Sequence, residues 1–219
     1  TNRMGRCIYI FTNSYKPELG GIQTVTSQFA ETIHQRGGKV CVVTNVGKKN
    51  FLPISFICGV PVVRLPFRYK YGIVTPFLCL LFLFRRPKAV YVHFPQEMSK
   101  YVLRLRKYYT FEIITCFHGH DVKMYYEGFE KDNELFRYKY ELAHTSDKVT
   151  ACSGYLAKKV EEMFNCENVI PVYNGVDLSR FNEHKANPYK KPYLFAFGRL
   201  EVAKGFDLLI KAFANVVNR

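Results

Sequence analysis

The stretch "RCIYIFTNSYKPELGGIQTVTSQFAETIHQRGGKVCVVT", residues 6–44, decides the fold of this chain. Its opening run, CIYIFT, is apolar without alternation, as in a strand that is buried on both faces. From Ile22 to Gln35 apolar residues recur every three or four positions, which predicts a helix. Gly37 and Gly38 end that helix, and KVCVVT predicts a second buried strand. The stretch is therefore a strand–helix–strand unit, whose parallel strands should be joined by a right-handed connection.

The same alternation of strand and helix continues along most of the chain. Further strands are predicted over residues 60–66, 89–94, 112–117, 148–153 and 168–177. Further helices are predicted over residues 72–84, 97–107, 132–146 and 154–164. Because strands that alternate with helices form α/β folds, we predict a Rossmann-like parallel sheet with helices on both faces over residues 1–178.

The composition changes after residue 178. The polar segment 179–192, with prolines near its end, predicts a linker. YLFAFGRL, residues 193–200, then predicts a new buried strand, and residues 204–219 predict a helix. The apolar residues on one face of this helix are Phe206, Leu209, Ile210, Phe213, Val216 and Val217. One strand and one helix cannot bury such a face, so we expect residues 193–219 to be the truncated start of a second α/β domain, and the exposed helix to offer a surface for self-association.

The chain of 219 residues has a formal net charge of +14, which favours anionic partners such as a nucleotide, a nucleic acid or an acidic membrane surface. Between Arg64 and Lys107 there are ten Lys or Arg and a single acidic residue, Glu97. This region contains "GIVTPFLCLLFLF", residues 72–84. A helix of that length spans about 20 Å, which is too short to cross a hydrocarbon core of about 30 Å. The run therefore predicts a buried or an interfacial helix.

Seven cysteines form no CxxC pair, and most of them lie within apolar runs. A reduced thiol in such a run behaves as a small hydrophobic side chain. The N-terminal apolar run is too short for a secretory signal. We therefore expect a reducing, cytoplasmic compartment.

Gly20 and Gly21 follow the first predicted strand and open the first predicted helix. Backbone amides at a helix N-terminus bind phosphate well where no Cβ stands in the way. The spacing is not GxGxxG, however, and the approach NSYKPEL is too long for a tight dinucleotide turn. The local sequence leaves a plain loop and a phosphate site equally open.

Polar residues also follow two neighbouring predicted strands. His118, His120 and Asp121 belong to "HGHD", directly after the strand 112–117, and His93 closes the preceding strand. Open α/β sheets bind ligands at the carboxyl ends of their strands. These side chains could ligate a metal, relay protons or hold sugar hydroxyls, and isolated structural histidines are the alternative. No further ligands stand at the spacing of a metal site, so we expect no metal.

Two more candidates lie near the domain junction. Asn174 belongs to "YNGVD", which is also a common turn signal. Arg199 and Lys204, in "FGRLEVAKG", flank a predicted strand-to-helix corner, where a guanidinium and an ammonium group suit a diphosphate. The alternative for both cations is an ordinary solvated surface.

Taken in order, "GGIQTVTSQFAETIHQRGGKVCVVT", "VYVHFPQ", "HGHD", "KVTACSGYLAKKV", "VIPVYNGVDLSRF" and "YLFAFGRLEVAKGFDLLIKAF" resemble the retaining GT-B glycosyltransferases of family GT4. The resemblance implies two Rossmann-like domains that face a cleft, with the acceptor mainly on the first and the nucleotide-sugar donor mainly on the second. It also implies transfer without a metal or other cofactor. The donor phosphate itself would assist front-face attack, so that no protein nucleophile is needed.

The resemblance also implies roles for the candidate residues. Gly20 and Gly21 would approach the donor diphosphate or the acceptor, and Arg199 and Lys204 would clamp the diphosphate and stabilise the leaving group. His118 would touch the transferred sugar. Among the remaining candidates, we assign Asn174 to the donor and His93, His120 and Asp121 to the acceptor.

One departure from the family concerns its pair of glutamates, seven residues apart in the second domain, which this chain does not contain. We therefore expect no sugar transfer from the 219-residue chain alone. In a longer protein, the expected acceptor is a glycan or a lipid-linked sugar, in cell-surface polysaccharide or glycolipid biosynthesis.

The basic region between Arg64 and Lys107 could place the protein at the inner face of a membrane. On the predicted helix from Glu97, Lys100, Arg104 and Lys107 share a face that could rest on anionic lipid. A core helix beside a solvated face is the alternative.

A GT-B-like sugar-nucleotide epimerase is one alternative to the function of a glycosyltransferase. A basic nucleic-acid-binding module is another, but it lacks a binding motif, and we expect no nucleic-acid partner.

Overall fold

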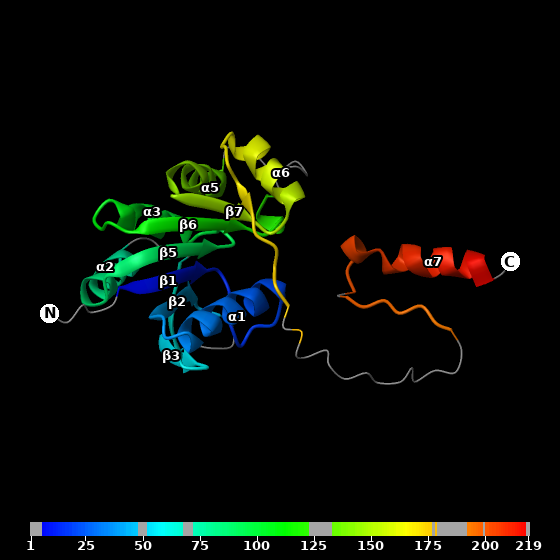
Figure 1. Ribbon diagram of the computed structural model, residues 1–219, viewed down its shortest axis with the longest axis horizontal. Helices are drawn as coiled ribbons and strands as arrows, with labels where there is room; N and C mark the ends of the chain where they lie inside the picture. Colours follow the sequence, from blue (N-terminus) through cyan, green and yellow to red (C-terminus); the bar gives the residue numbers. More distant parts are fainter. Residues whose placement is uncertain are drawn as a thin grey trace. The chain divides into compact units, whose positions relative to one another are not determined.

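The computed structural model describes residues 6–47, 52–67, 72–122, 133–176, 178, 192–198 and 200–217. The chain divides into two units, Thr1–Gly175 and Val176–Arg219. Figure 1 shows the sheet and most of the helices within the first unit.

The first unit contains an eight-stranded sheet in the order β3-β4-β2-β1-β5-β6-β7-β8. Its strands are β1 (Cys7–Thr12), β2 (Val40–Asn45), β3 (Ile54–Ile57), β4 (Val60–Leu65), β5 (Pro87–His93), β6 (Glu112–Phe117), β7 (Lys148–Ala151) and β8 (Ile170–Pro171). Every neighbouring pair is parallel except β3 and β4. The predicted Rossmann-like parallel sheet is confirmed.

Helices cover both faces of this sheet, as predicted. They are α1 (Gly21–Gln35), α2 (Val74–Phe84), α3 (Ser99–Arg106), α5 (Glu134–Thr145) and α6 (Gly154–Phe164). Successive side chains of a strand point to opposite faces, so each strand supplies two cores. Ile10, for example, packs in the core that contains α1 residue Ala30. Tyr9 and Phe11 pack instead with Phe82 of α2, in the core that α2 and α3 share.

The edge strand β3 is not predicted from the sequence. It pairs antiparallel with β4 across a two-residue turn, Cys58-Gly59, with Ile57 opposite Val60. Both turn residues have positive φ, 49° at Cys58 and 78° at Gly59, as in the type I′ turns that suit hairpins. The usual signal for such a turn is Asn-Gly or Asp-Gly. Because a cysteine precedes Gly59 here, the sequence lacks this signal.

The last predicted strand, residues 168–177, is much shorter than expected. Only Ile170 and Pro171 belong to β8, opposite Thr150 and Ala151 of β7. Pro171 has no N–H group to extend the ladder. Residues 172–176 are exposed and have no regular structure.

The second unit contains a short 3-10 helix, η2 (Val202–Lys204), and α7 (Phe206–Val217). The predicted helix is confirmed, and none of its residues is buried. The predicted buried strand at 193–200 is wrong for its described residues, because 193–198 form no strand and Phe197 is 85% exposed. A strand needs a neighbour to pair with, and the described residues of this unit provide none.

Within the described ranges, no helix combines the length and the apolar character that a membrane span needs. The predicted short apolar helix is α2, with Val74, Leu78 and Phe82 on its buried side. On α3, Tyr101 and Val102 are buried.

Candidate functional site

The order of the strands reverses at β1, which lies between β2 and β5. Open α/β sheets place their ligands at such a switch point, beyond the carboxyl ends of the strands. Thr12 ends β1 opposite His93, the last residue of β5. His93 in turn lies opposite Cys116 of β6. The polar candidates His93 and His118 are therefore brought to one edge of the sheet.

His93 is tied to the helix that follows β1. Its Nδ1 lies 2.7 Å from Oγ1 of Thr26, a buried residue of α1. The Thr26 hydroxyl donates to the carbonyl oxygen of Ile22, also at 2.7 Å. Because that bond uses the hydroxyl proton, Thr26 is the acceptor for His93. His93 therefore carries its proton on Nδ1, which leaves the lone pair on Nε2.

The Nε2 atom of His93 is buried and has no hydrogen-bond partner among the described residues. The rings of His93 and His118 are adjacent, with centroids 4.1 Å apart. Burial lowers the pKa of His93 to about 3, and the neighbouring His118 adds to that effect. Burial likewise lowers the pKa of His118 to about 4. Both imidazoles are therefore neutral near pH 7, suited to hydrogen bonding and not to ion pairing.

Asp121 holds the backbone that carries His118. Its carboxylate is fully buried and accepts hydrogen bonds from the amides of His118, at 3.1 Å, and Gly119, at 2.7 Å. Desolvation raises the pKa of Asp121 to about 6, against the opposing effects of these amides and of Lys139. Buried Lys139 donates to the backbone carbonyl of Asp121 at 2.8 Å. The geometry thus gives Asp121 a positioning role.

Gly20 and Gly21 lie where the sequence places them, at the start of α1. Gly20 is the N-cap, and no side chain caps the helix there. A Cβ added to Gly21 would meet nothing within 4 Å, whereas one on Gly20 would meet the flexible side chain of Gln23. Gly21 lies five residues before Thr26, about 7.5 Å along the helix axis. The first turn thus belongs to the same helix as the residue that contacts His93, and no side chain caps its amides.

A hydrogen bond from Arg64 and an ion pair of Lys16 hold the loop between β1 and α1. Buried Arg64 of β4 donates to the backbone carbonyl of Lys16 at 3.1 Å and to Oγ of Ser55 at 2.6 Å. Lys16 itself forms an ion pair with Glu31 of α1 at 2.7 Å. These contacts position the loop against the end of the sheet, and Arg64 is therefore a structural part of the site.

The structure brings only some of the predicted residues together. His93, His118 and Asp121 form one cluster, which Thr26 joins to the helix that Gly20 and Gly21 open. His120 and Asn174 are exposed. Lys204 is exposed in the second unit, and Arg199 lies outside the described residues.

Sequence reasoning missed three residues of the site. Thr26 resembles any polar residue of an amphipathic helix, and Cys116 resembles any small apolar residue of a strand. Arg64 is counted only as part of a basic region. A threonine or an arginine on an element with buried neighbours is the signal that could have indicated Thr26 and Arg64, but that signal does not name the partner.

One group of side chains has the spacing of a metal site. Ligand atoms of His93, Cys116 and His118 lie within 4.8 Å of one another. Zinc would bind such a set through a thiolate. Burial raises the pKa of the Cys116 thiol, which keeps its proton in place. Its Sγ lies 3.4 Å from Nε2 of His118, so the S–H group can donate there. Independence from metal stays a prediction.

The doubly wound sheet, with polar residues at the carboxyl ends of its strands, defines a Rossmann-like domain. The model of Glycosyltransferase Family 4 matches residues 19–180, which is more than half of the chain. The chain belongs to this family. No curated protein sequence matches it.

Solved structures share this fold at low sequence identity. Sucrose-phosphate synthase from Thermosynechococcus elongatus is 14% identical, with a TM-score of 0.71 over 96% of this chain and 60% of that one. The catalytic domain of starch synthase IV from Arabidopsis thaliana, bound to ADP and acarbose, is 11% identical, with a TM-score of 0.52 over 86% of this chain and 55% of that one. The first unit is the Rossmann-like half of a GT-B fold, and the chain spans less than two thirds of either structure's length.

Proposed function

We propose that this protein transfers a sugar from a nucleotide-sugar donor to an acceptor, with retention of configuration. The observation that carries the proposal is the pair His93 and His118, two neutral imidazoles at the carboxyl ends of adjacent strands in a family 4 chain. A neutral imidazole can hydrogen-bond a sugar hydroxyl without carrying a charge. His118 would therefore orient an uncharged sugar without fixing a counter-ion.

The roles of His118 and His93 follow from how deeply each is buried. Half-buried His118 would contact the transferred sugar. The buried ring of His93, which lies against the ring of His118, would hold His118 in position. The carboxylate of Asp121, on the same loop as His118, already accepts hydrogen bonds from the amides of His118 and Gly119. This supports a reaction in which the donor phosphate assists front-face attack, without an aspartate nucleophile from this loop.

The donor would be held by its diphosphate. The uncapped amides after Gly20 and Gly21 suit phosphate oxygens. Arg199 and Lys204 would clamp the diphosphate and stabilise the leaving group without a metal. Asn174 would contact the donor from the segment after β8. The ADP in the starch synthase structure is consistent with a nucleotide donor.

The acceptor would be a glycan or a lipid-linked sugar, in the synthesis of a cell-surface polysaccharide or glycolipid. His120, which is exposed beside His118, would face it. The protein would work in the cytoplasm, at the inner face of a membrane. Exposed Ile210 and Val217 belong to an apolar face of α7 that would allow self-association.

A panel of nucleotide sugars tests the proposal. The assay compares the 219-residue chain with a polypeptide in which a complete second domain continues it, and we expect transfer only from the longer polypeptide. His118→Ala should lower the rate of transfer at least about tenfold, the effect of one lost hydrogen bond of about 1.4 kcal/mol. His144→Ala, at an exposed position on α5, is the matched control. Equal rates for the two variants would contradict the role of His118.

A further inference from the structure

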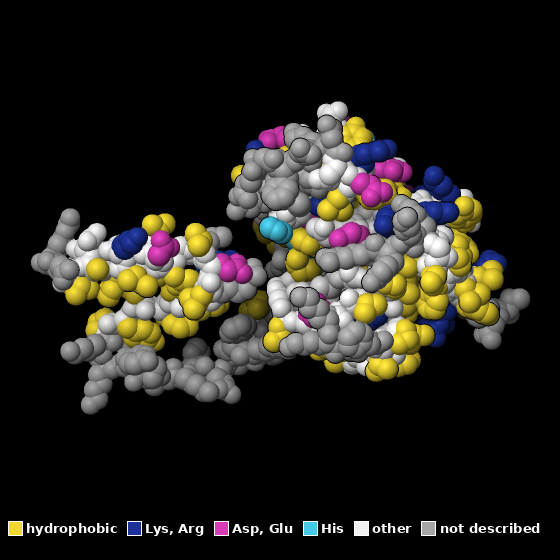
Figure 2. Space-filling model, turned by 180° about the vertical axis from the view of Figure 1, so that it is seen from behind, with side chains coloured by type: hydrophobic (Ala, Val, Ile, Leu, Met, Phe, Trp, Pro, Cys, Tyr) yellow, Lys and Arg dark blue, Asp and Glu magenta, His cyan; other side chains and the backbone are white. Residues whose placement is uncertain are grey.

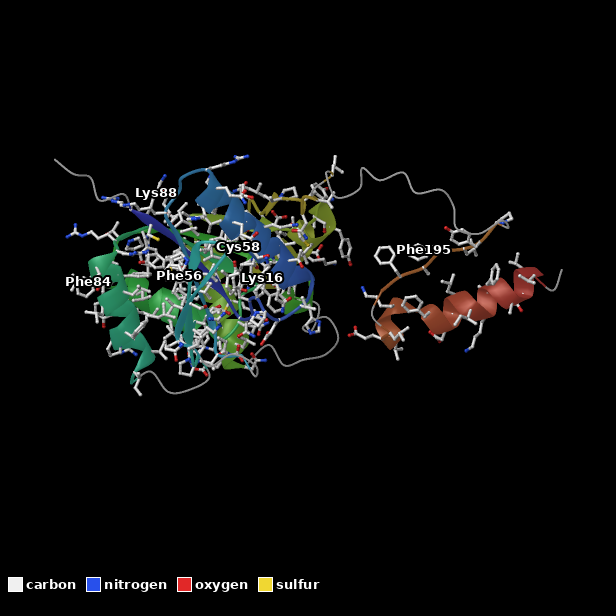
Figure 3. The ribbon with its side chains drawn as sticks, turned by 90° about the horizontal axis from the view of Figure 1, so that it is seen from below. Lys16, Phe56, Cys58, Phe84, Lys88 and Phe195 are labelled. Carbon is white, nitrogen blue, oxygen red and sulfur yellow. The ribbon has the colours of Figure 1, made fainter. Side chains whose placement is uncertain are left out.

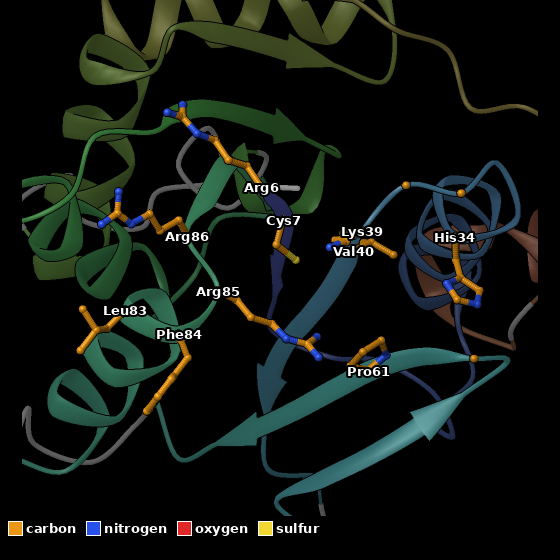
Figure 4. Close-up of a pocket in the computed structure, with 13 residues that line it drawn as sticks. Arg6, Cys7, His34, Lys39, Val40, Pro61, Leu83, Phe84, Arg85 and Arg86 are labelled. Atoms are coloured by element: carbon orange, nitrogen blue, oxygen red, sulfur yellow. The ribbon is translucent and has the colours of Figure 1, made fainter. Parts of the chain in front are cut away.

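A cavity lies at the opposite end of the sheet from the histidine pair, where the parallel strands begin. Its volume is about 820 Å³, and it lies among the starts of β1 and β2 and the ends of α1 and α2. Four of its lining residues are cations, Arg6, Lys39, Arg85 and Arg86, and none is acidic. Figure 4 shows Arg85 extending across this space toward Pro61. The cavity is therefore a basic pocket that no role in sugar transfer accounts for.

The helix ends beside this pocket do not explain its charge. The C-termini of α1 and α2 each carry about half a negative charge from the helix dipole, so about one cation would balance both. The four cations exceed this, and all four are exposed. No ion pair joins any of them to an acid among the described residues. The positive charge of this end is thus open to an external anion.

The helix that ends at this pocket has an unusual outer face. α2 buries Val74, Leu78 and Phe82, yet its solvent side is also apolar. The large apolar side chains on that side, with their exposed fractions, are Ile73 (82%), Leu80 (51%), Leu83 (63%) and Phe84 (73%). A helix on the surface of a globular protein normally presents charged residues to water, and α2 contains none.

The apolar side chains and the cations meet at one end of the first unit. Leu83 and Phe84 line the pocket themselves, directly before Arg85 and Arg86. Figure 3 shows Phe84 and Lys88 at the same end of the sheet. In Figure 2, Lys and Arg side chains stand beside hydrophobic ones at the end of the unit that carries α2. We call the set Leu80, Leu83, Phe84, Arg6, Lys39, Arg85 and Arg86 the α2 surface.

We infer that the α2 surface docks on a membrane of anionic phospholipids. Leu80, Leu83 and Phe84 would enter the boundary between headgroups and acyl chains, while Arg85 and Arg86 bind the lipid phosphates. α2 is too short to span the bilayer and lies in its interface. A nucleic acid would use the same cations but would leave three exposed aliphatic and aromatic side chains unexplained. The apolar stripe therefore favours lipid.

This inference deepens the membrane placement in the proposed function. Sugar transfer to a soluble acceptor would remain possible if the surface bound no lipid, so the two proposals can fail separately. The inference also locates the contact, at the start of the strands. The proposed sugar site at the carboxyl ends of the strands would then remain open to the cytoplasm.

Co-sedimentation of the 219-residue chain with vesicles tests the inference, using pure phosphatidylcholine and a mixture with phosphatidylglycerol. We expect binding to the anionic mixture alone. Each cation near an anionic surface contributes about fivefold in affinity, so Arg85→Gln with Arg86→Gln should weaken binding about 25-fold. Lys158→Gln with Lys211→Gln removes the same charge at exposed positions on α6 and α7 and should change binding much less.

The apolar half of the surface has its own variant. Leu83→Ser with Phe84→Ser should abolish most of the binding, and Phe56→Ser, at a 72% exposed position on β3, is its control. Circular dichroism and thermal unfolding check that each variant is folded. Binding that is equal on both vesicle types, or unaffected by Leu83→Ser with Phe84→Ser, would overturn lipid docking. So would a DNA duplex that binds as tightly as the anionic vesicles and displaces them.

Discussion

The Nδ1 atom of His93 lies 2.7 Å from the hydroxyl oxygen of Thr26, and this contact joins β5 to α1. It fixes the tautomer of His93, because the Thr26 hydroxyl already donates to Ile22. It also links the two parts of the proposed site, since α1 begins with the open glycine pair. The imidazole beside His118 and the amides that would bind phosphate are therefore linked through α1.

Replacing Thr26 by valine should destabilise the protein by about 1–3 kcal/mol, because Nδ1–H of His93 would be left buried without an acceptor. Urea unfolding measures this free energy, and ¹⁵N shifts of the imidazole report any change of tautomer. Thr24→Val is the control, because Thr24 is exposed on the same helix and makes a comparable bond to the carbonyl of Gly20. Equal losses from both variants would contradict a special role for Thr26.

Stability should fall as the pH drops from about 6 to about 4. His93 and His118 have folded-state pKa values near 3 and 4, below the unfolded value of 6.5, so the unfolded chain binds more protons in this window. Asp121, raised to about 6, acts in the opposite direction. Because two histidines act against one aspartate, the free energy of unfolding should fall by about 1.4 kcal/mol for each unit that the pH drops.

His118→Gln should flatten that slope, because His93 and Asp121 then nearly cancel. Urea unfolding at several pH values between 4 and 6 measures it. His144→Gln, on the surface of α5, is the matched control. A slope that His118→Gln leaves unchanged would show that His118 is not held neutral by the fold.

Asp121→Ala should destabilise the protein by about 1–3 kcal/mol and loosen the His118 loop, since two backbone amides lose their acceptor. Hydrogen exchange at the amides of His118 and Gly119 should become faster. Asp147→Ala is a milder comparison, because Asp147 accepts a single amide bond, from Ile113, and its side chain is 43% exposed. Unchanged exchange at His118 would contradict the positioning role of Asp121.

Removal of metal ions should leave the melting temperature unchanged. The reason is that the raised pKa of the Cys116 thiol disfavours the thiolate that zinc needs. Thermal unfolding before and after dialysis against a chelator measures this. If added zinc raised the melting temperature of the native chain but not of Cys116→Ser, then His93, Cys116 and His118 would form a metal site after all.

Most of the sheet could be predicted because its central strands and the helices between them carry their own local signals. The apolar run before Thr12 and the helical period up to Gln35 need no distant partner to be recognised. Strands whose existence depends on a neighbour were less predictable. Residues 193–198 have the composition of a strand, but the described part of their unit contains no strand with which they could pair. β3 exists because the turn at Gly59 folds it onto β4.

The candidate site divides in the same way. His93 and His118 could be placed together, because parallel strands end at one edge of a sheet. The bond from His93 to Thr26 spans 67 positions of the sequence, and nothing local in α1 indicates it. Asp121 was predicted to face the acceptor, whereas its carboxylate is turned to the backbone of its own loop. Sequence periodicity identifies which residues are near an edge, but not which polar atoms pair there.

The most direct test of the central claim is transfer of a labelled sugar from a nucleotide-sugar panel, with the products identified by mass spectrometry. The assay uses the polypeptide in which a complete second domain continues this chain. We predict a product of retained configuration, formed without added metal, at a rate that His118→Ala lowers at least about tenfold. A folded polypeptide that transfers no sugar from any donor, or one whose rate is the same with His118→Ala, would contradict the account.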